Sequence, residues 1–105
     1  MNYAGRYRFK PRRKDKNHPE IAAALKLARI DYLDTAQFGC PFDFLVAVGG
    51  KILLIEAKDG DKSPSERRLT EDEKELDDML RRNGCQLHVV GSPDEALELL
   101  TGERK

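Results

Sequence analysis

The chain has 105 residues, which is enough for one domain with one modest hydrophobic core. Its 19 lysine and arginine residues balance its 19 aspartate and glutamate residues, so the formal net charge is zero. The sequence contains no long apolar run, and its basic N-terminus lacks the apolar stretch of a secretory signal, so we expect neither a membrane-spanning nor a secreted protein. Cys40 and Cys85 have no metal-ligand spacing, and we expect both to be reduced packing residues in a cytoplasmic protein.

The zero net charge hides an uneven distribution, because residues 1–17 carry +6 and residues 18–105 carry −6. Aromatic side chains are interleaved with the N-terminal cations. This composition favours a disordered arm over residues 1–16 that follows a phosphate backbone and stacks on bases. A solvated tail that aids solubility is the alternative. The arm cations expected to bind nucleic acid are Arg6, Arg8, Lys10, Arg12, Arg13 and Lys14.

Residues 17–102 are expected to form the folded domain. Asn17 and Glu20 have the spacing of a capping box, which predicts that a helix begins here. Apolar residues recur behind them at helical spacing. A short strand is expected near Tyr32–Ala36, followed by a turn over Gln37–Pro41.

Two apolar runs, Phe42–Val48 and Lys51–Ala57, are joined by Gly49 and Gly50. A two-residue Gly-Gly link between strand-like runs predicts a tight β-hairpin. Such a hairpin pairs Val48 with Lys51, and this register fixes every other pair in the two strands.

The same register puts Asp43 directly opposite Glu56, with both side chains on one face, and Lys58 two residues further along that face. Paired carboxylates repel, and apolar neighbours such as Leu45 and Leu54 would strip their solvation. A divalent cation between the carboxylates would remove both penalties. An ammonium group beside that cation would complete a site for hydrolysing a phosphodiester. The alternative is an ordinary strand start with a salt-bridged edge.

The segments after the hairpin alternate between helix and strand. Thr70 and Glu73 have the spacing of a second capping box, and a cap is the main role expected for Glu73. Ser92 and Pro93 have the order typical of a helix start. A polar loop, a helix, a strand and a last helix are therefore expected over residues 59–68, 70–84, 86–90 and 92–102.

This α-β-β-β-α-β-α order predicts a three-layer α/β/α domain with a mixed four-stranded sheet. The first three strands can run antiparallel through short links. A right-handed helical crossover then makes the fourth strand parallel to the third. Both faces of the sheet are largely apolar, so we expect helices on both sides.

Four short segments resemble motifs of one enzyme family, the PD-(D/E)XK nuclease superfamily, which has a restriction-endonuclease-like fold. The likeness is greatest to small phage-type virus-replication-repair nucleases (VRR-NUC) and to Holliday-junction-resolvase-like nucleases. Two departures are that Phe42 separates Pro41 from Asp43, and that Glu73 replaces a glutamine found in many relatives. The segments are Asn17-His18-Pro19-Glu20-Ile21, Gly39-Cys40-Pro41-Phe42-Asp43, Ile55-Glu56-Ala57-Lys58 and Pro64-Ser65-Glu66-Arg67-Arg68-Leu69-Thr70.

The resemblance implies a Mg²⁺ or Mn²⁺ site formed by Asp43, Glu56 and the Ala57 carbonyl. It implies that Lys58 holds or helps to deprotonate the attacking water, and that Glu20 lies at the rim, where it binds a second cation through water or orients the nucleophile. The expected protein is a metal-dependent endonuclease acting on DNA, with branched or junction DNA as one substrate class. A homodimer would supply two symmetric cuts. If the chain is phage-encoded, it would act in the cytoplasm of the bacterial host.

Other polar residues have two interpretations each. Lys62, Arg67 and Arg68 precede a helix start, where they could contact DNA phosphates or remain solvated. His18 is expected to be a solvated first-turn residue rather than a ligand, and His88 to lie on a face of the sheet. Two other functions stay open: a module of the same fold that binds nucleic acid without cutting it, and a small phage structural or regulatory protein with a structural cation.

Overall fold

The computed structural model describes residues 17–63 and 67–103. The arm expected at residues 1–16, with its six candidate DNA-binding cations, lies outside the described residues, as do residues 64–66 of the loop motif. No helix in the described ranges is long and apolar enough to cross a membrane. The elements in chain order are α1 (His18–Leu27), β1 (Asp31–Asp34), the short 3-10 helix η2 (Thr35–Phe38), β2 (Phe44–Val48), β3 (Lys51–Ala57), α2 (Glu71–Arg82), β4 (Leu87–Val90) and α3 (Pro93–Glu103).

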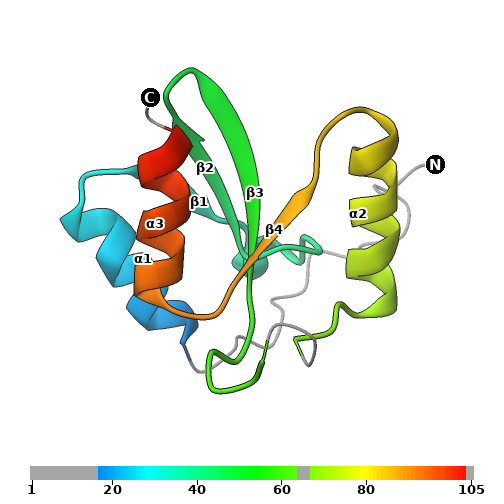
Figure 1. Cartoon of the computed structure of the whole chain (residues 1–105), viewed down its shortest axis with the longest axis horizontal. Coiled ribbons are helices and arrows are strands. Elements are labelled where there is room, and N and C mark those ends of the chain that lie inside the picture. The colour runs from blue at the N-terminus through cyan, green and yellow to red at the C-terminus, as the bar shows by residue number, and fades with distance from the viewer. Residues whose placement is uncertain (1–16, 64–66, 104–105) are drawn as a thin grey trace.

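The four strands form one mixed sheet in the order β1-β2-β3-β4. The β1–β2 and β2–β3 pairs are antiparallel, whereas β3 and β4 are parallel. Figure 1 shows α1 and α3 next to each other on one side of the sheet, with α2 on the other side. The predicted element order, the mixed sheet and the parallel last strand are therefore confirmed.

The β2–β3 hairpin has the predicted register. Val48 pairs with Lys51, and the ladder continues without a slip to the pair of Phe44 with Ile55. Gly49 and Gly50 have φ angles of 58° and 80°, in the left-handed region that a two-residue hairpin turn requires and that glycine adopts without a steric penalty.

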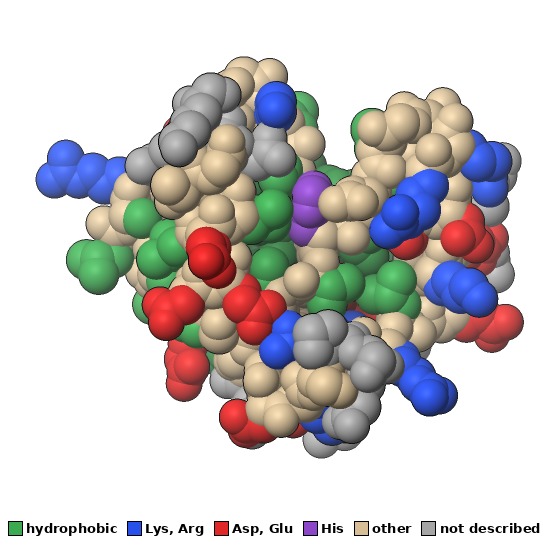
Figure 2. Space-filling view, in the orientation of Figure 1, with side chains coloured by type: hydrophobic (Ala, Val, Ile, Leu, Met, Phe, Trp, Pro, Cys, Tyr) green, Lys and Arg blue, Asp and Glu red, His purple; other side chains and the backbone are tan. Residues whose placement is uncertain are grey.

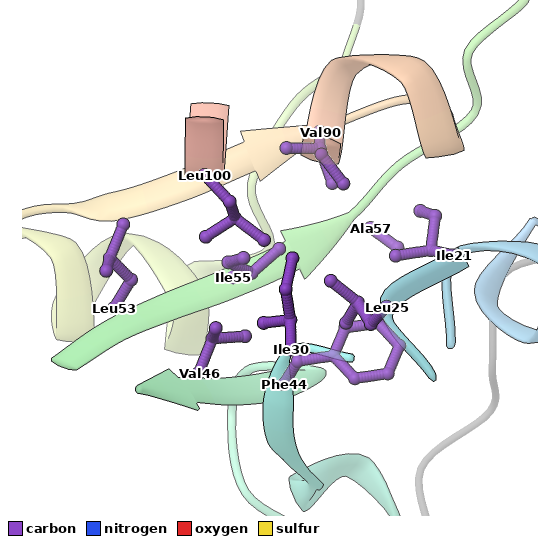
Figure 3. Packing of buried hydrophobic residues seen from close by; sticks show 11 residues of the cluster. Ile21, Leu25, Ile30, Phe44, Val46, Leu53, Ile55, Ala57, Val90 and Leu100 are labelled. Carbon is purple, nitrogen blue, oxygen red and sulfur yellow. The ribbon is translucent and has the colours of Figure 1, made fainter. Parts of the chain in front are cut away.

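The hydrophobic core lies between the sheet and the α1–α3 pair (Figure 3). Alternation explains its composition, because every second side chain of β2 and β3 faces the two helices. The core residues are Ile21, Leu25, Ile30, Phe44, Val46, Leu53, Ile55, Ala57, Val90, Ala96 and Leu100.

Helix α2 packs against the other face at β4. Leu76 is buried there, and the carboxylate of Asp77 accepts hydrogen bonds from the Leu87 N–H at 2.8 Å and from Arg81 Nε at 2.9 Å. Burial would raise the pKa of Asp77, but the bonds from Arg81 and from the Leu87 N–H outweigh burial and hold that pKa below its usual value. The ionised Asp77 side chain thus links α2 to β4.

Helix α2 leaves part of this second face open. Leu33 on β1 and Ile52 on β3 are 58% and 71% exposed. The expectation that helices cover both faces therefore holds fully on the α1–α3 side and only near β4 on the α2 side.

The segment between β1 and β2 differs from its prediction. The strand expected to reach Ala36 ends at Asp34 and continues as η2. The cause is Asp43, whose carbonyl accepts the Thr35 and Ala36 N–H groups at 2.9 and 3.3 Å and draws the chain into a turn. Cys85 is exposed rather than packed, although both cysteines are free as expected.

Candidate metal and catalytic site

Hydrogen bonds to main-chain groups hold both the backbone and the carboxylate of Asp43 in place. Its N–H donates to the Ile55 carbonyl at 3.0 Å, its carbonyl accepts from Thr35, and its Oδ2 accepts from the Ala57 N–H at 2.8 Å. The residue is only 4% exposed. The position of this carboxylate is therefore set by the ends of three neighbouring segments rather than by its own flexibility.

These bonds change the expected relation between Asp43 and Glu56. The regular ladder of paired residues ends at Phe44 and Ile55. The Asp43 N–H also donates to the Ile55 carbonyl, so Asp43 does not form the next pair of the ladder with Glu56. The prediction that Asp43 lies directly opposite Glu56 in the ladder is therefore wrong. Both carboxylates are still at the same end of the hairpin, and Glu56 is 3% exposed.

Lys58 lies between two buried carboxylates. Its Nζ is 2.8 Å from Glu73 Oε1 and 3.4 Å from Glu56 Oε2, and its side chain is 17% exposed. Burial alone would lower the pKa of Lys58, but the hydrogen bond to Glu73 and the charges of Glu56 and Glu73 outweigh burial and raise that pKa above its usual value. The side chain is consequently held as an ammonium ion.

Glu73 combines the predicted cap with a second role. The Thr70–Glu73 capping box is present, since Glu73 Oε1 accepts the Thr70 N–H at 2.8 Å and the Thr70 hydroxyl accepts the Glu73 N–H. The same Oε1 accepts from Lys58, and Glu73 is fully buried. Sequence reasoning missed this contact.

His18 is a site residue that the sequence did not identify. It is 1% exposed, and its ring stacks on Phe44 with 4.4 Å between centroids. Its Nε2 is 3.0 Å from Asp34 Oδ2, and its Nδ1 is 3.4 Å from Asp43 Oδ1. The prediction of a solvated first-turn residue is wrong because carboxylates from β1 and from the start of β2 surround the first turn of α1.

The predicted capping box at Asn17 is also wrong. Asn17 makes no side-chain cap bond, and its Nδ2 instead donates to the carbonyls of Lys58 at 2.6 Å and Gly91 at 2.7 Å. Glu20 is therefore not part of a capping box, and its side chain is exposed. It lines a hollow of about 450 Å³ together with Asn17, Asp59 and the β4–α3 turn. This hollow adjoins the segment that follows β3, and the rim position of Glu20 stays a prediction.

The candidate phosphate-binding cations of the polar loop have different surroundings. Arg67 donates to Glu95 at 2.7 Å and to the carbonyls of Lys62 and Gly60 at 3.0 and 3.2 Å. The hydrogen bond from Arg67 holds the pKa of Glu95 below its usual value despite partial burial. Arg67 therefore ties the loop to α3, whereas Lys62 and Arg68 are exposed and able to meet a phosphate.

A larger hollow than the one beside Glu20 lies elsewhere on the described surface. Figure 2 shows it between the α3 side and the α2 side, with a histidine at its floor. Its volume is about 590 Å³, and its lining residues include His88 of β4, Arg81 and Glu98. Neither Asp43 nor Glu56 lines this hollow, so its large volume does not mark the candidate metal site.

The donor set can be compared with the metal that the sequence resemblance implies. Carboxylate oxygens of Asp43 and Glu56, with the Ala57 carbonyl beside them in the chain, are the hard ligands that suit Mg²⁺ or Mn²⁺. Within residues 17–63 and 67–103, no three His, Cys, Asp or Glu side chains converge on one metal position. The donors present thus fit such a cation in type, with water or substrate oxygens needed to fill the remaining positions.

Comparison of the chain with protein-family models, with curated proteins and with solved structures found no match.

Proposed function

We propose that this protein is a metal-dependent endonuclease that hydrolyses DNA phosphodiester bonds. The observation that carries the proposal is the end of the β2–β3 hairpin, where Asp43 and Glu56 are almost completely buried and the Lys58 ammonium is 3.4 Å from Glu56. Two buried carboxylates and an ammonium group are costly to assemble, and such costs concentrate at functional sites. The resemblance of these segments to PD-(D/E)XK motifs supports the same activity.

In this proposal Asp43 and Glu56 hold Mg²⁺ or Mn²⁺, and the bound cation polarises the scissile phosphate and acidifies water. Asp43 keeps its orientation because its Oδ2 accepts a hydrogen bond from the Ala57 N–H. Lys58, 3.4 Å from Glu56, would hold or help to deprotonate the attacking water and would contribute positive charge where negative charge grows in the transition state. Exposed Lys62 and Arg68 would bind flanking phosphates.

The test is cleavage of plasmid, linear and four-way-junction DNA in Mg²⁺, Mn²⁺ or EDTA. Asp43→Asn should abolish cleavage while keeping the fold, and Mg²⁺ should raise the wild-type Tm without changing that of the variant. Lys58→Ala should lower the rate by about 10²-fold or more. Asp31→Asn and Lys74→Ala, at exposed positions, are the matched controls and should cut normally. Cleavage by Asp43→Asn would refute the proposal.

A second candidate is a module of this fold that binds nucleic acid without cutting it. It is favoured by one observation: Lys58 is already bound by Glu73 at 2.8 Å. This candidate predicts DNA binding that survives EDTA and an absence of nicks in every metal. The proposed nuclease predicts nicks that EDTA stops.

A further inference from the structure

The two ring nitrogens of His18 face carboxylates on opposite sides. Nε2 is 3.0 Å from Asp34 Oδ2, within hydrogen-bonding distance. Nδ1 is 3.4 Å from Asp43 Oδ1, and it makes no hydrogen bond within the described part of the chain although it is buried. The ring is also fixed from one face by its stacking on Phe44.

The shorter contact decides how a neutral His18 ring is arranged. A neutral imidazole carries one N–H and one lone pair. In the neutral form the shorter contact favours an N–H on Nε2 that donates to Asp34, which leaves the lone pair on Nδ1. That lone pair then faces the Asp43 oxygen, and two acceptors meet in a buried place without a hydrogen between them. A cation held by both atoms would turn this repulsion into attraction.

We propose that His18 Nδ1 and Asp43 Oδ1 together bind a divalent transition-metal ion, with Asp34 orienting the histidine. Metal–nitrogen and metal–oxygen bonds of about 2.0–2.2 Å at a right angle separate two ligand atoms by about 3 Å. The observed 3.4 Å needs only a small closure. A carboxylate that accepts the far N–H of a metal-bound histidine is a recurrent outer-shell arrangement. Asp34 has that position relative to His18.

The nitrogen ligand specifies the class of metal. Imidazole suits ions such as Fe²⁺, Ni²⁺ and Zn²⁺, whereas Mg²⁺ prefers oxygen ligands and keeps its water. The inference rests on the proposed function in one respect, since both use Asp43. It goes further by naming a ligand from α1 beside Asp43 and by favouring a transition-metal ion over Mg²⁺ as the occupant.

The experiment uses Mn²⁺ as the probe and reads the metal's own spectrum rather than cleavage. Electron spin-echo envelope modulation of bound Mn²⁺ should reveal coupling to a ¹⁴N nucleus. The chain has two histidines, so growth with ¹⁵N-histidine labels only His18 and His88. The coupling should change to that of ¹⁵N and should persist in His88→Gln. Bound Mn²⁺ without nitrogen coupling, or coupling that His88→Gln removes, would overturn the inference.

Variants of the two partners extend the test. His18→Gln should abolish the coupling and weaken Mn²⁺ binding by at least about tenfold, and Asp34→Asn should weaken it by about 10–100-fold, the usual loss for an outer-shell partner. Mg²⁺ binding should change much less in both variants. If His18→Gln does not fold, the labelled wild type and His88→Gln still decide the question.

The outcomes separate this inference from the proposed function. Nitrogen-coupled Mn²⁺ in a protein that never cuts DNA supports the His18 ligand and refutes the nuclease. DNA cleavage that depends on Asp43, with no nitrogen coupling, supports the nuclease and refutes the His18 ligand. Mn²⁺ that does not bind at all overturns the His18 ligand, and Mg²⁺-dependent cleavage then decides the nuclease separately.

Discussion

The Lys58–Glu73 ion pair gives a quantitative prediction for Glu73→Gln. Glutamine keeps an oxygen that can accept from Thr70 and from Lys58, but it removes the negative charge. Hydrogen bonds to charged groups contribute about 1.5–3 kcal/mol and neutral ones about 0.5–1.5 kcal/mol, so we expect a loss of about 1–2 kcal/mol. The larger cost of breaking a fully buried pair does not apply, because Lys58 keeps Glu56 at 3.4 Å and some contact with water.

Urea unfolding at neutral pH measures this loss, with Glu71→Gln in the exposed first turn of α2 as the control. Glu73→Ala, which also removes the bond to Thr70, should cost about 2–4 kcal/mol. In a Lys58→Met background, Glu73→Gln should become neutral or stabilising, since it then removes a buried charge that has lost its ammonium partner. Raising the pH offers a further check. The raised pKa of Lys58 means that the pair stabilises fully below about pH 10.4 and less as the pH rises through the folded-state pKa.

The reasoning would be refuted if Glu73→Gln unfolded at the wild-type urea concentration, or if its loss equalled that of Glu73→Ala. The first result would mean that the charge at Glu73 contributes nothing. The second would mean that packing or the cap, rather than the pairing with Lys58, sets the stability of this position.

Three further predictions concern the loops, the helix α2 and the N-terminal arm. Gly60→Ala should cost roughly 1–3 kcal/mol or more in urea unfolding, because its Cβ would overlap the Gly91 carbonyl oxygen, whereas Gly102→Ala, with open space around it, should be neutral or slightly stabilising. Asp77→Asn should flatten the fall in stability on acidification below about pH 4. The folded-state pKa of Asp77 is lowered, so its stabilisation is present above the unfolded-state pKa and is lost as the pH falls through the folded-state pKa. An acid-unfolding profile unchanged by the substitution would argue against the Asp77 contacts. Deleting residues 1–16 should reduce the slope of log affinity for DNA against log salt concentration by roughly 3 units if about three arm cations neutralise phosphates, and an unchanged slope would exclude the arm from binding.

Local sequence signals predicted those parts of the fold that local physics controls. The Gly49-Gly50 turn specified the register of β2 with β3 because a two-residue link leaves only one pairing. The capping box at Thr70 formed because both partners belong to the same turn of helix. In each case a few neighbouring residues carry all the information.

The site was only partly predictable because its polar contacts join distant segments. Asn17 has the spacing of a cap, yet its amide bonds to carbonyls 41 and 74 residues away. His18 and Glu73 are polar residues at helix starts, where an exposed side chain is the usual expectation. In the structure both are buried, His18 beside the Asp34 carboxylate and Glu73 beside the Lys58 ammonium group. A short sequence pattern does not include partners that are so far away in the chain, so it cannot predict these contacts. A buried histidine between two aspartates can be recognised only after α1 has been packed against the sheet.

The double hydrogen bond of Asn17 has a consequence for how the domain assembles. One amide group at the start of α1 donates to the ends of both β3 and β4, so it can be satisfied only after the parallel crossover is complete. Formation of such a contact brings together the beginning, middle and end of the folded sequence, which is entropically the most expensive kind of loop closure. We therefore expect docking of the first turn of α1 to be a late folding event. Amide hydrogen exchange there should report opening of the whole sheet edge rather than local fraying.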